Sequence, residues 1–179
     1  NLSDVAEVLR QKVISSHTNA IIFTDSPNKR IPLIAADLTD IINSDSENRL
    51  QIIGLTRWDL ESSIMLEPAL AGSWLAVPDN RFRKIYEEKF LKKFGYRPHL
   101  TSNLAYDAVA AMGVLIQKRS ITKSMHPLNT NGLTNINGFI GVDGIFRFKP
   151  DGRIEKELSI VEVKKGSTNI LKPAANKFP

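Results

Sequence analysis

The first 55 residues alternate between helical and strand patterns, and this alternation constrains the fold more than any other feature of the chain. Apolar residues recur at helical spacing in residues 4–14 and 31–42, whereas residues 20–24 and 51–55 are short, continuous apolar runs. Runs of this kind are typical of strands buried on both faces, and strands joined through helices are parallel. The sequence therefore predicts an α/β fold, a parallel sheet with flanking helices.

The alternation stops after a third predicted strand, residues 73–77, which ends at Pro78. Two helices follow, from about residue 80 to 94 and from about 102 to 116, with no strand between them. Residues 142–148 and 153–163 then predict an antiparallel hairpin, because the intervening Pro150-Asp151-Gly152 has the residues of a tight turn. We expect the chain to pass into a different structural body near Pro78.

Composition excludes several classes of function. The formal charge is +5, but the basic residues of 81–93 alternate with Glu87 and Glu88, which is typical of a solvated helix face and not of a nucleic-acid site. There is no cysteine, so disulfides and thiolate metal sites are excluded. No apolar run approaches the roughly 20 residues of a membrane span. The chain begins at Asn1, so we expect any export signal or lipid anchor to lie upstream.

Catalytic motifs are missing from the sequence. His17, His99 and His126 lack the spacing of metal ligands. Neither a Gly-x-Ser-x-Gly nucleophile elbow nor a glycine-rich phosphate loop occurs. The sequence therefore predicts a protein that is not an enzyme, with no catalytic residue, no metal and no cofactor.

Candidate binding residues follow the first two predicted strands, because ligands of open α/β sheets lie beyond the carboxyl ends of the strands. Asp25 and Ser26 follow the first strand, and Thr56, Arg57 and Trp58 follow the second. Arginine and tryptophan together suit a ligand with a carboxylate and an apolar body. The alternative is that Trp58 fills a surface groove while Arg57 stays solvated.

Tyr106, with Asp107 next to it near the start of the second long helix, is a further candidate for ligand contact. The alternative is that its ring packs in the core while its hydroxyl bonds a neighbour.

Four segments, taken in order, carry a resemblance to a known family. They are Gly54-Leu55-Thr56-Arg57-Trp58-Asp59, Glu67-Pro68-Ala69-Leu70-Ala71-Gly72-Ser73-Trp74, Leu104-Ala105-Tyr106-Asp107-Ala108-Val109, and Gly138-Phe139 through Asp143-Gly144-Ile145-Phe146-Arg147-Phe148 to Pro150-Asp151-Gly152. The set resembles the C-terminal half of type I periplasmic binding proteins, in the branch that holds branched-chain amino-acid receptors and penicillin-binding-protein activators. The resemblance covers roughly residues 5 to 166.

The resemblance implies a partial two-lobed fold. Residues 1–78 would form an α/β unit of the second lobe, 79–141 a helical segment of the first lobe, 142–166 a hairpin that returns to the second lobe, and 167–179 a loose tail. Most of the first lobe lies outside this chain, so we expect exposed apolar surface where its sheet would pack. The 79–140 helices would either pack back on the α/β core or pair with a second copy, giving a homodimer.

The function implied is that of a periplasmic receptor that binds a small solute, an amino acid or similar, between its lobes and delivers it to the membrane permease of an ABC importer. By position, the ligand residues would be Asp25, Ser26, Thr56, Arg57, Trp58 and Tyr106. One alternative is a periplasmic activator of a cell-wall synthase that acts by protein contact. Another is the effector-sensing core of a transcription regulator, whose DNA-binding segment would lie upstream. No nucleic-acid partner is predicted for the chain itself.

Overall fold

The computed structural model describes residues 2–24, 30–42, 50–122 and 128–179, and these form two compact units. Unit 1 contains Asn1–Val77 and Ile160–Lys172, and unit 2 contains Pro78–Ser159 and Pro173–Pro179. The chain therefore passes between the units three times, first between Val77 and Pro78. The assignment of these segments to the lobes of a binding protein stays a prediction.

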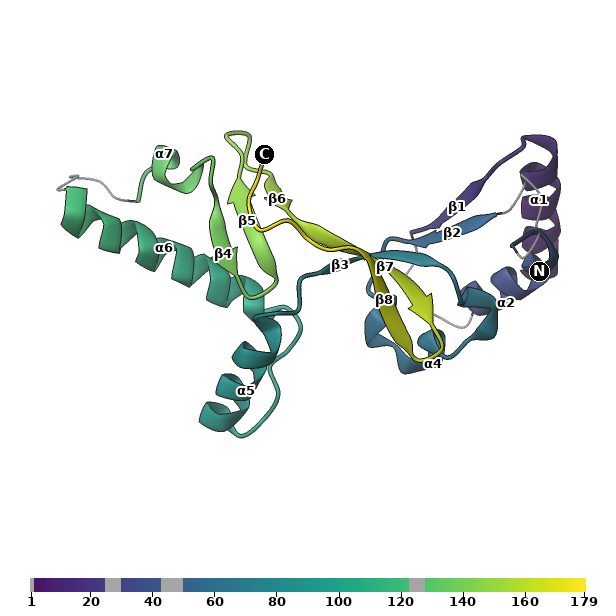
Figure 1. Cartoon of the computed structure of the whole chain (residues 1–179), viewed down its shortest axis with the longest axis horizontal. Coiled ribbons are helices and arrows are strands. Elements are labelled where there is room, and N and C mark those ends of the chain that lie inside the picture. The colour runs from purple at the N-terminus through teal and green to yellow at the C-terminus, as the bar shows by residue number, and fades with distance from the viewer. Residues whose placement is uncertain (1, 25–29, 43–49, 123–127) are drawn as a thin grey trace. The chain divides into compact units, whose positions relative to one another are not determined.

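Unit 1 is built on a five-stranded sheet with the order β1-β2-β3-β7-β8 (Figure 1). The strands β1 (Ala20–Phe23), β2 (Gln51–Gly54) and β3 (Trp74–Pro78) are parallel, with Ile21 opposite Ile52 and Ile53 opposite Trp74. Helix α1 (Leu2–Ser15) precedes β1, and the helices α2 (Arg30–Asp37) and α3 (Thr39–Ile42) lie between β1 and β2. Between β2 and β3 lie η1 (Trp58–Leu60), α4 (Ser62–Met65) and η2 (Pro68–Leu70). The predicted parallel sheet with flanking helices is confirmed.

The core of unit 1 lies on one face of its sheet. Ile52, Leu75 and Val163 are at most 2 % exposed and pack with residues of α1, α2 and α4. Successive strand residues point to opposite faces, and the alternate positions remain open: Ile22 is 56 % and Trp74 40 % exposed. The prediction that these strands are buried on both faces is therefore wrong for the described part of the chain, because helices cover one face only.

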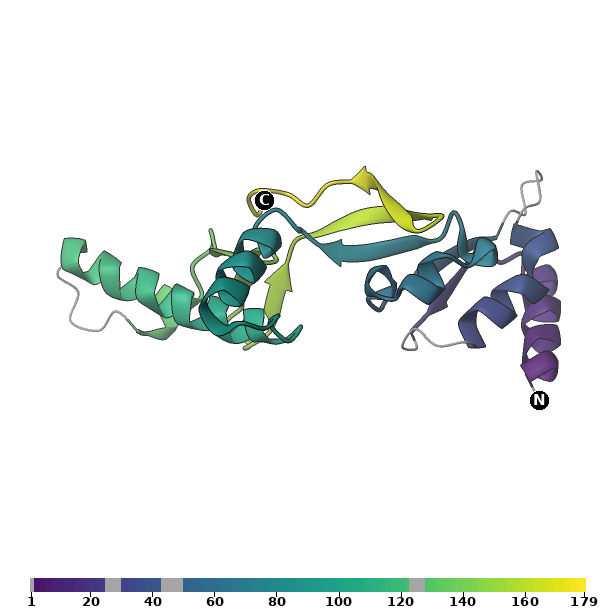
Figure 2. The same ribbon diagram turned by 90° about the horizontal axis from the view of Figure 1, so that it is seen from below.

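Unit 2 combines helices with a three-stranded antiparallel sheet of the order β4-β5-β6. Its helices are α5 (Arg83–Phe94), α6 (Ser102–Thr122) and α7 (Thr130–Leu133), and its strands are β4 (Phe139–Gly141), β5 (Gly144–Phe148) and β6 (Ile154–Lys156). A small core joins Ala111 and Leu115 of α6 to Phe139 and Phe146 of the sheet. Within this unit the sheet lies on one side of α6 and α5 on another (Figures 1 and 2).

Two predictions for the last 40 residues need correction. Of the hairpin predicted over 142–166, only the first part forms, where β5 pairs with β6. The strand β7 (Leu158–Lys164) joins the sheet of unit 1 instead. The expected loose tail is ordered: β8 (Ser167–Lys172) pairs with β7, and Phe178 then packs 4.3 Å from the Arg147 guanidinium in unit 2. Backbone pairing and this cation–π contact hold a segment in which apolar and polar residues do not alternate.

No helix within the described residues is both long and apolar enough to cross a membrane.

Candidate functional site

The loop after β2 carries three of the predicted ligand residues. The Leu55 N–H donates to the carbonyl of Phe23 (3.0 Å), so the carboxyl ends of β1 and β2 lie side by side, as strand order requires. The Trp58 N–H donates to the carbonyl of Thr56 (2.9 Å), which turns the chain sharply after the strand. Thr56 and Arg57 are half-buried at this edge of the sheet. Asp25 and Ser26 lie outside the described residues.

Arg57 is held by a neighbour in its own loop. Its Nε and one terminal nitrogen donate to the two carboxylate oxygens of Asp59, both at 2.8 Å. The side chains of Arg57 and Asp59 are 29 % and 13 % exposed. This two-point pairing fixes the plane of the guanidinium and places both signs of charge side by side at the carboxyl edge of the sheet.

Trp58 lies in the core of unit 1 and not in a surface groove. Its side chain has no exposed surface, and its ring packs 6.1 Å from that of Phe23. Gly54 permits this approach, because a Cβ at that position would lie 2.8 Å from the indole. The indole Nε1 has no hydrogen-bond partner among the described residues. A role for Trp58 as a ligand contact stays a prediction, and in this structure the residue packs the strand end.

Tyr106 belongs to unit 2, where it is 54 % exposed, so it is not a core residue. Its ring lies 5.1 Å from that of Tyr86 on α5. Both rings line an apolar groove of about 640 Å³ between α5, α6 and β4. The other large residues of the groove are Phe82, Ile85, Phe90, Phe94 and Ile140, and Lys89 and Lys93 are its basic residues.

Beside this groove is a buried polar network that sequence reasoning did not find. Asp143 accepts hydrogen bonds from Arg83 of α5 and Asn103 of α6, and Lys156 lies 4.0 Å away. Asp107 of α6 accepts from the backbone N–H of Val142 at 2.8 Å. The network anchors the turn between β4 and β5 to both helices. Asp107 and Asp143 are present in the motifs of the sequence, but their hydrogen-bond partners are 35 to 60 residues distant, so no local pattern reveals the network.

Asp107 is expected to make unit 2 sensitive to pH. Burial raises the pKa of this carboxyl, against the smaller opposing effect of the Val142 N–H. The folded state therefore holds the proton more tightly than the unfolded chain, so ionisation of Asp107 opposes folding. The free-energy cost of this ionisation is absent at pH values below the ordinary carboxyl pKa and is complete at pH values above the raised pKa. We expect Asp107→Asn to gain stability relative to the wild type as pH rises from 4 to 7.

Urea unfolding at the two pH values, followed by circular dichroism, measures this change. Asp107→Ala serves as the control, because it removes both the ionisable group and the acceptor of the Val142 N–H. It should destabilise unit 2 by about 1.5–3 kcal/mol. Parallel pH profiles for the wild type and Asp107→Asn would contradict the assignment.

No group of three or more histidine, aspartate or glutamate side chains that could hold a metal ion occurs within the described ranges.

No protein-family model matches this sequence. A comparison with curated proteins finds no match either. Solved structures do match. A protein assigned to branched-chain amino-acid ABC transport in Rhodospirillum rubrum aligns with a TM-score of 0.65 and 20% identity over 96% of this chain and 48% of its own. An ABC transporter substrate-binding protein of Desulfitobacterium hafniense, solved with leucine, aligns with a TM-score of 0.57 and 18% identity over 96% and 48%.

A third structure is the C-domain of LpoA from Haemophilus influenzae, a regulator of PBP1A, with a TM-score of 0.51 and 13% identity over 95% of this chain and 49% of its own. This chain thus spans about half the length of the structures it matches. Identities this low establish the fold and nothing finer. The mixed sheet, the two units and the near-complete alignment agree with the resemblance in the sequence, and the chain has the fold of one half of a type I periplasmic binding protein.

Proposed function

We propose that this chain is part of a non-enzymatic periplasmic protein that binds a small zwitterionic solute, such as an amino acid, for uptake by an ABC importer. The observation that carries the proposal is the Arg57–Asp59 pair at the carboxyl edge of the parallel sheet of unit 1. In open α/β folds ligands bind at this edge, and an amino acid presents a carboxylate and an ammonium group that complement the two side chains. The Desulfitobacterium hafniense protein of the same fold is solved with leucine.

A bound solute would replace part of the Arg57–Asp59 pairing with contacts of its own. The Arg57 guanidinium would donate hydrogen bonds to the solute carboxylate, and the Asp59 carboxylate would accept them from the solute ammonium group. Thr56, half-buried beside them, would supply a hydroxyl. Trp58 remains a candidate from the same edge of the sheet and Tyr106 a candidate from unit 2, and Asp25 and Ser26, which follow β1 in the sequence, remain candidates as well.

Titration calorimetry of the protein produced from its own gene, against a panel of amino acids, tests the proposal. Arg57→Gln should lower the affinity for the solute that binds most tightly by about 10- to 100-fold, because it removes a hydrogen bond to a charged group. Arg153→Gln is the matched control. Arg153 also pairs with an aspartate two residues away, Asp151, but on the exposed β5–β6 turn of unit 2. Equal affinities for the two variants would refute the assigned site.

A second candidate is activation of a cell-wall synthase through protein contact. The observation in its favour is the likeness to the LpoA C-domain, which covers 95% of this chain. The same experiment separates the two functions. If no solute in the panel releases heat and a cell-wall synthase is retained on the immobilised protein, the activator role is supported and the receptor role fails.

A further inference from the structure

The strand β8 is the outermost strand at one end of the unit 1 sheet, as far as the described residues define that sheet. It pairs with β7 and lies on the far side of β7 from β3 (Figure 2). All six residues of Ser167–Lys172 are exposed. The backbone N–H and C=O groups on the outer edge of such a strand point to solvent, where another extended chain can pair with them. The strand β8 therefore offers an edge to which a further strand can be added.

The interior of β8 lacks the features that usually protect an edge strand. Proteins block open edges with proline, with charged side chains along the strand, or with a bulge. Residues 168–171 contain neither proline nor a charged side chain. The irregularity in the β7–β8 pairing lies between Ile160 and Val161, which is opposite the end of β8. The stretch from Thr168 to Leu171 can thus accept a strand along its whole length.

One face of β8 continues the core of unit 1. Ile170 lies opposite Val161 of β7, which is 2 % exposed, so the two side chains share the core face of the sheet. Ile170 itself is 61 % exposed at the margin of this core. The turn between β7 and β8 is held in place, since the Gly166 N–H donates to the carbonyl of Met65 at 2.9 Å. A strand added to this fixed edge would cover Ile170 and extend the core.

The charges around β8 indicate the chemistry of its partner. Residues 163–172 contain three lysines and no acidic residue. Lys164 pairs with Glu162 of its own strand at 2.7 Å. Lys165, which lies just before β8, and Lys172, which ends it, are exposed and form no ion pair with any described residue. A strand that carries a carboxylate near each of its ends would complement both lysines.

We propose that the outer edge of β8 is the docking site for an extended segment of a partner protein, in which apolar residues alternate with aspartate or glutamate. The segment adds a further strand to the unit 1 sheet through backbone hydrogen bonds. Its apolar side chains lie beside Ile170 on the core face, and its acidic side chains pair with Lys165 and Lys172. The proposal does not depend on which solute the protein binds.

A second copy of β8 fits this edge less well. Strands related by a twofold axis run antiparallel, so the Lys165 end of one copy would lie beside the Lys172 end of the other. Like charges in such positions repel, and residues 163–172 supply no carboxylate to offset them. An acidic segment of another protein avoids this repulsion.

A synthetic peptide tests the edge on the protein produced from its own gene. The probe is a labelled heptapeptide of alternating glutamate and valine with blocked ends. Its control is the same peptide N-methylated at every residue, which keeps the side chains but loses the backbone donors. Fluorescence anisotropy should show that the control binds at least about 10-fold more weakly than the probe. In NMR titrations the probe should shift the amide signals of residues 167–172, and shifts confined to other segments would overturn the proposal.

Charge reversal separates this edge from the general positive charge of the chain. Lys165→Glu/Lys172→Glu should lower the affinity for the probe about 10-fold, because each change replaces an attraction with a repulsion. Lys84→Glu/Lys92→Glu, at two exposed positions of α5, changes the net charge equally and should leave the affinity unchanged. Equal affinities for the two double variants would refute the docking site.

A photo-cross-linker in place of Asn169, at an exposed position of β8, identifies the partner in cells. With p-benzoylphenylalanine there, photolysis should give adducts to a segment of another protein that has aspartate or glutamate at alternate positions, located by mass spectrometry. Adducts confined to a second copy of this chain, to lipid or to a segment without acidic residues would contradict the assigned partner, as would the absence of any adduct.

Discussion

Replacing Trp58 with alanine is expected to lower the free energy of unfolding of unit 1 by about 3–5 kcal/mol. The indole is fully buried and packs with Phe23 at the carboxyl edge of the sheet, where Gly54 is shaped around it. Its removal leaves a large cavity, and a loss of this size approaches the total stability of a small domain. We therefore expect unit 1 to be partly unfolded at 37 °C in this variant, or to melt well below the wild type.

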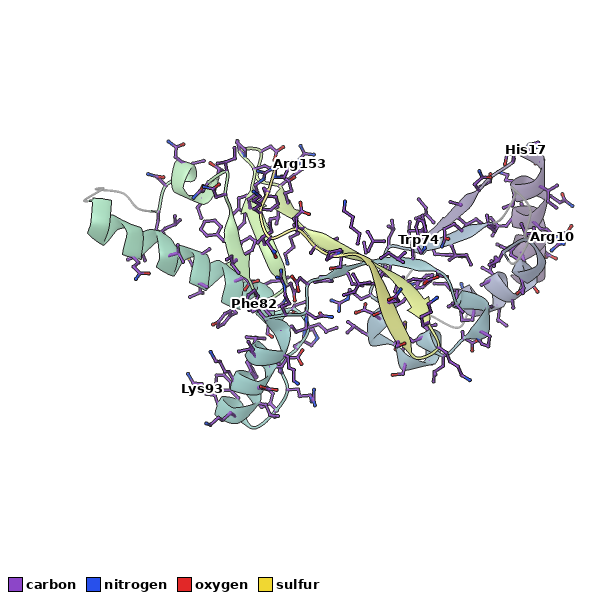
Figure 3. All side chains as sticks on the ribbon, viewed as in Figure 1. Arg10, His17, Trp74, Phe82, Lys93 and Arg153 are labelled. Atoms are coloured by element: carbon purple, nitrogen blue, oxygen red, sulfur yellow. The ribbon has the colours of Figure 1, made fainter. Side chains whose placement is uncertain are left out.

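The chain supplies a matched control, since its other tryptophan, Trp74, is 40 % exposed on β3 (Figure 3). Trp74→Ala should cost much less than Trp58→Ala. Denaturant unfolding monitored by tryptophan fluorescence reports on unit 1 alone, because both tryptophans lie there and all three tyrosines lie in unit 2. Similar midpoints for the two variants would contradict the burial of Trp58.

Trp58→Phe separates packing from ligand contact. This substitution retains an aromatic ring in the core, so unit 1 should stay folded. If Trp58 serves only the core, solute affinity in calorimetry should match that of the wild type. A loss of affinity in a fully folded Trp58→Phe protein would establish the residue as a ligand contact.

The second large effect is expected for Asp143→Ala in unit 2. Asp143 is 4 % exposed and accepts from both Arg83 and Asn103. Without it, the Arg83 guanidinium, whose side chain is 13 % exposed, loses its buried counter-charge. Removal of one partner from a buried ion pair typically costs about 3–5 kcal/mol, because the other charge stays desolvated.

Tyrosine absorbance follows unit 2 in this experiment, and Asp151→Ala is the control. Asp151 also pairs with an arginine, Arg153, but at a site where the two side chains are 48 % and 77 % exposed. Exposed ion pairs contribute little to stability, so this variant should unfold like the wild type. If the Asp143→Ala and Asp151→Ala proteins unfold at the same denaturant concentration, the network around Asp143 does not hold the turn between β4 and β5.

Much of the fold could be predicted from the sequence because its signals are local. The apolar runs at 20–24 and 51–55 and the helical periodicity between them identify two strands and a crossover, and a crossover makes the strands parallel. The Pro150-Asp151-Gly152 turn likewise marks β5 and β6, with Gly152 at φ 83°. These features depend on residues within a few positions of one another.

The partners of the second half of the chain could not be predicted in the same way. The segment 158–164 has the composition of a strand, but nothing in it says that it pairs with the sheet of unit 1 and not with β6. The strand β8 is exposed at all six of its positions. No face of it has to be apolar, and its sequence shows no apolar alternation. Pairing is decided by which backbone groups meet in space, and side-chain pattern carries little of that information.

The features of the candidate site likewise fall into those that the sequence predicts and those that only the fold decides. The sequence by itself determined that Thr56, Arg57 and Trp58 follow a buried strand, since strand polarity places them at the carboxyl edge of the sheet. Only the tertiary structure decided that Trp58 turns inward to the core while Arg57 pairs with Asp59. It also decided that, between residues 103 and 117, α6 buries one stripe and leaves the other positions open, because burial depends on which surfaces are present to pack, and a helix sequence records only that its faces are apolar.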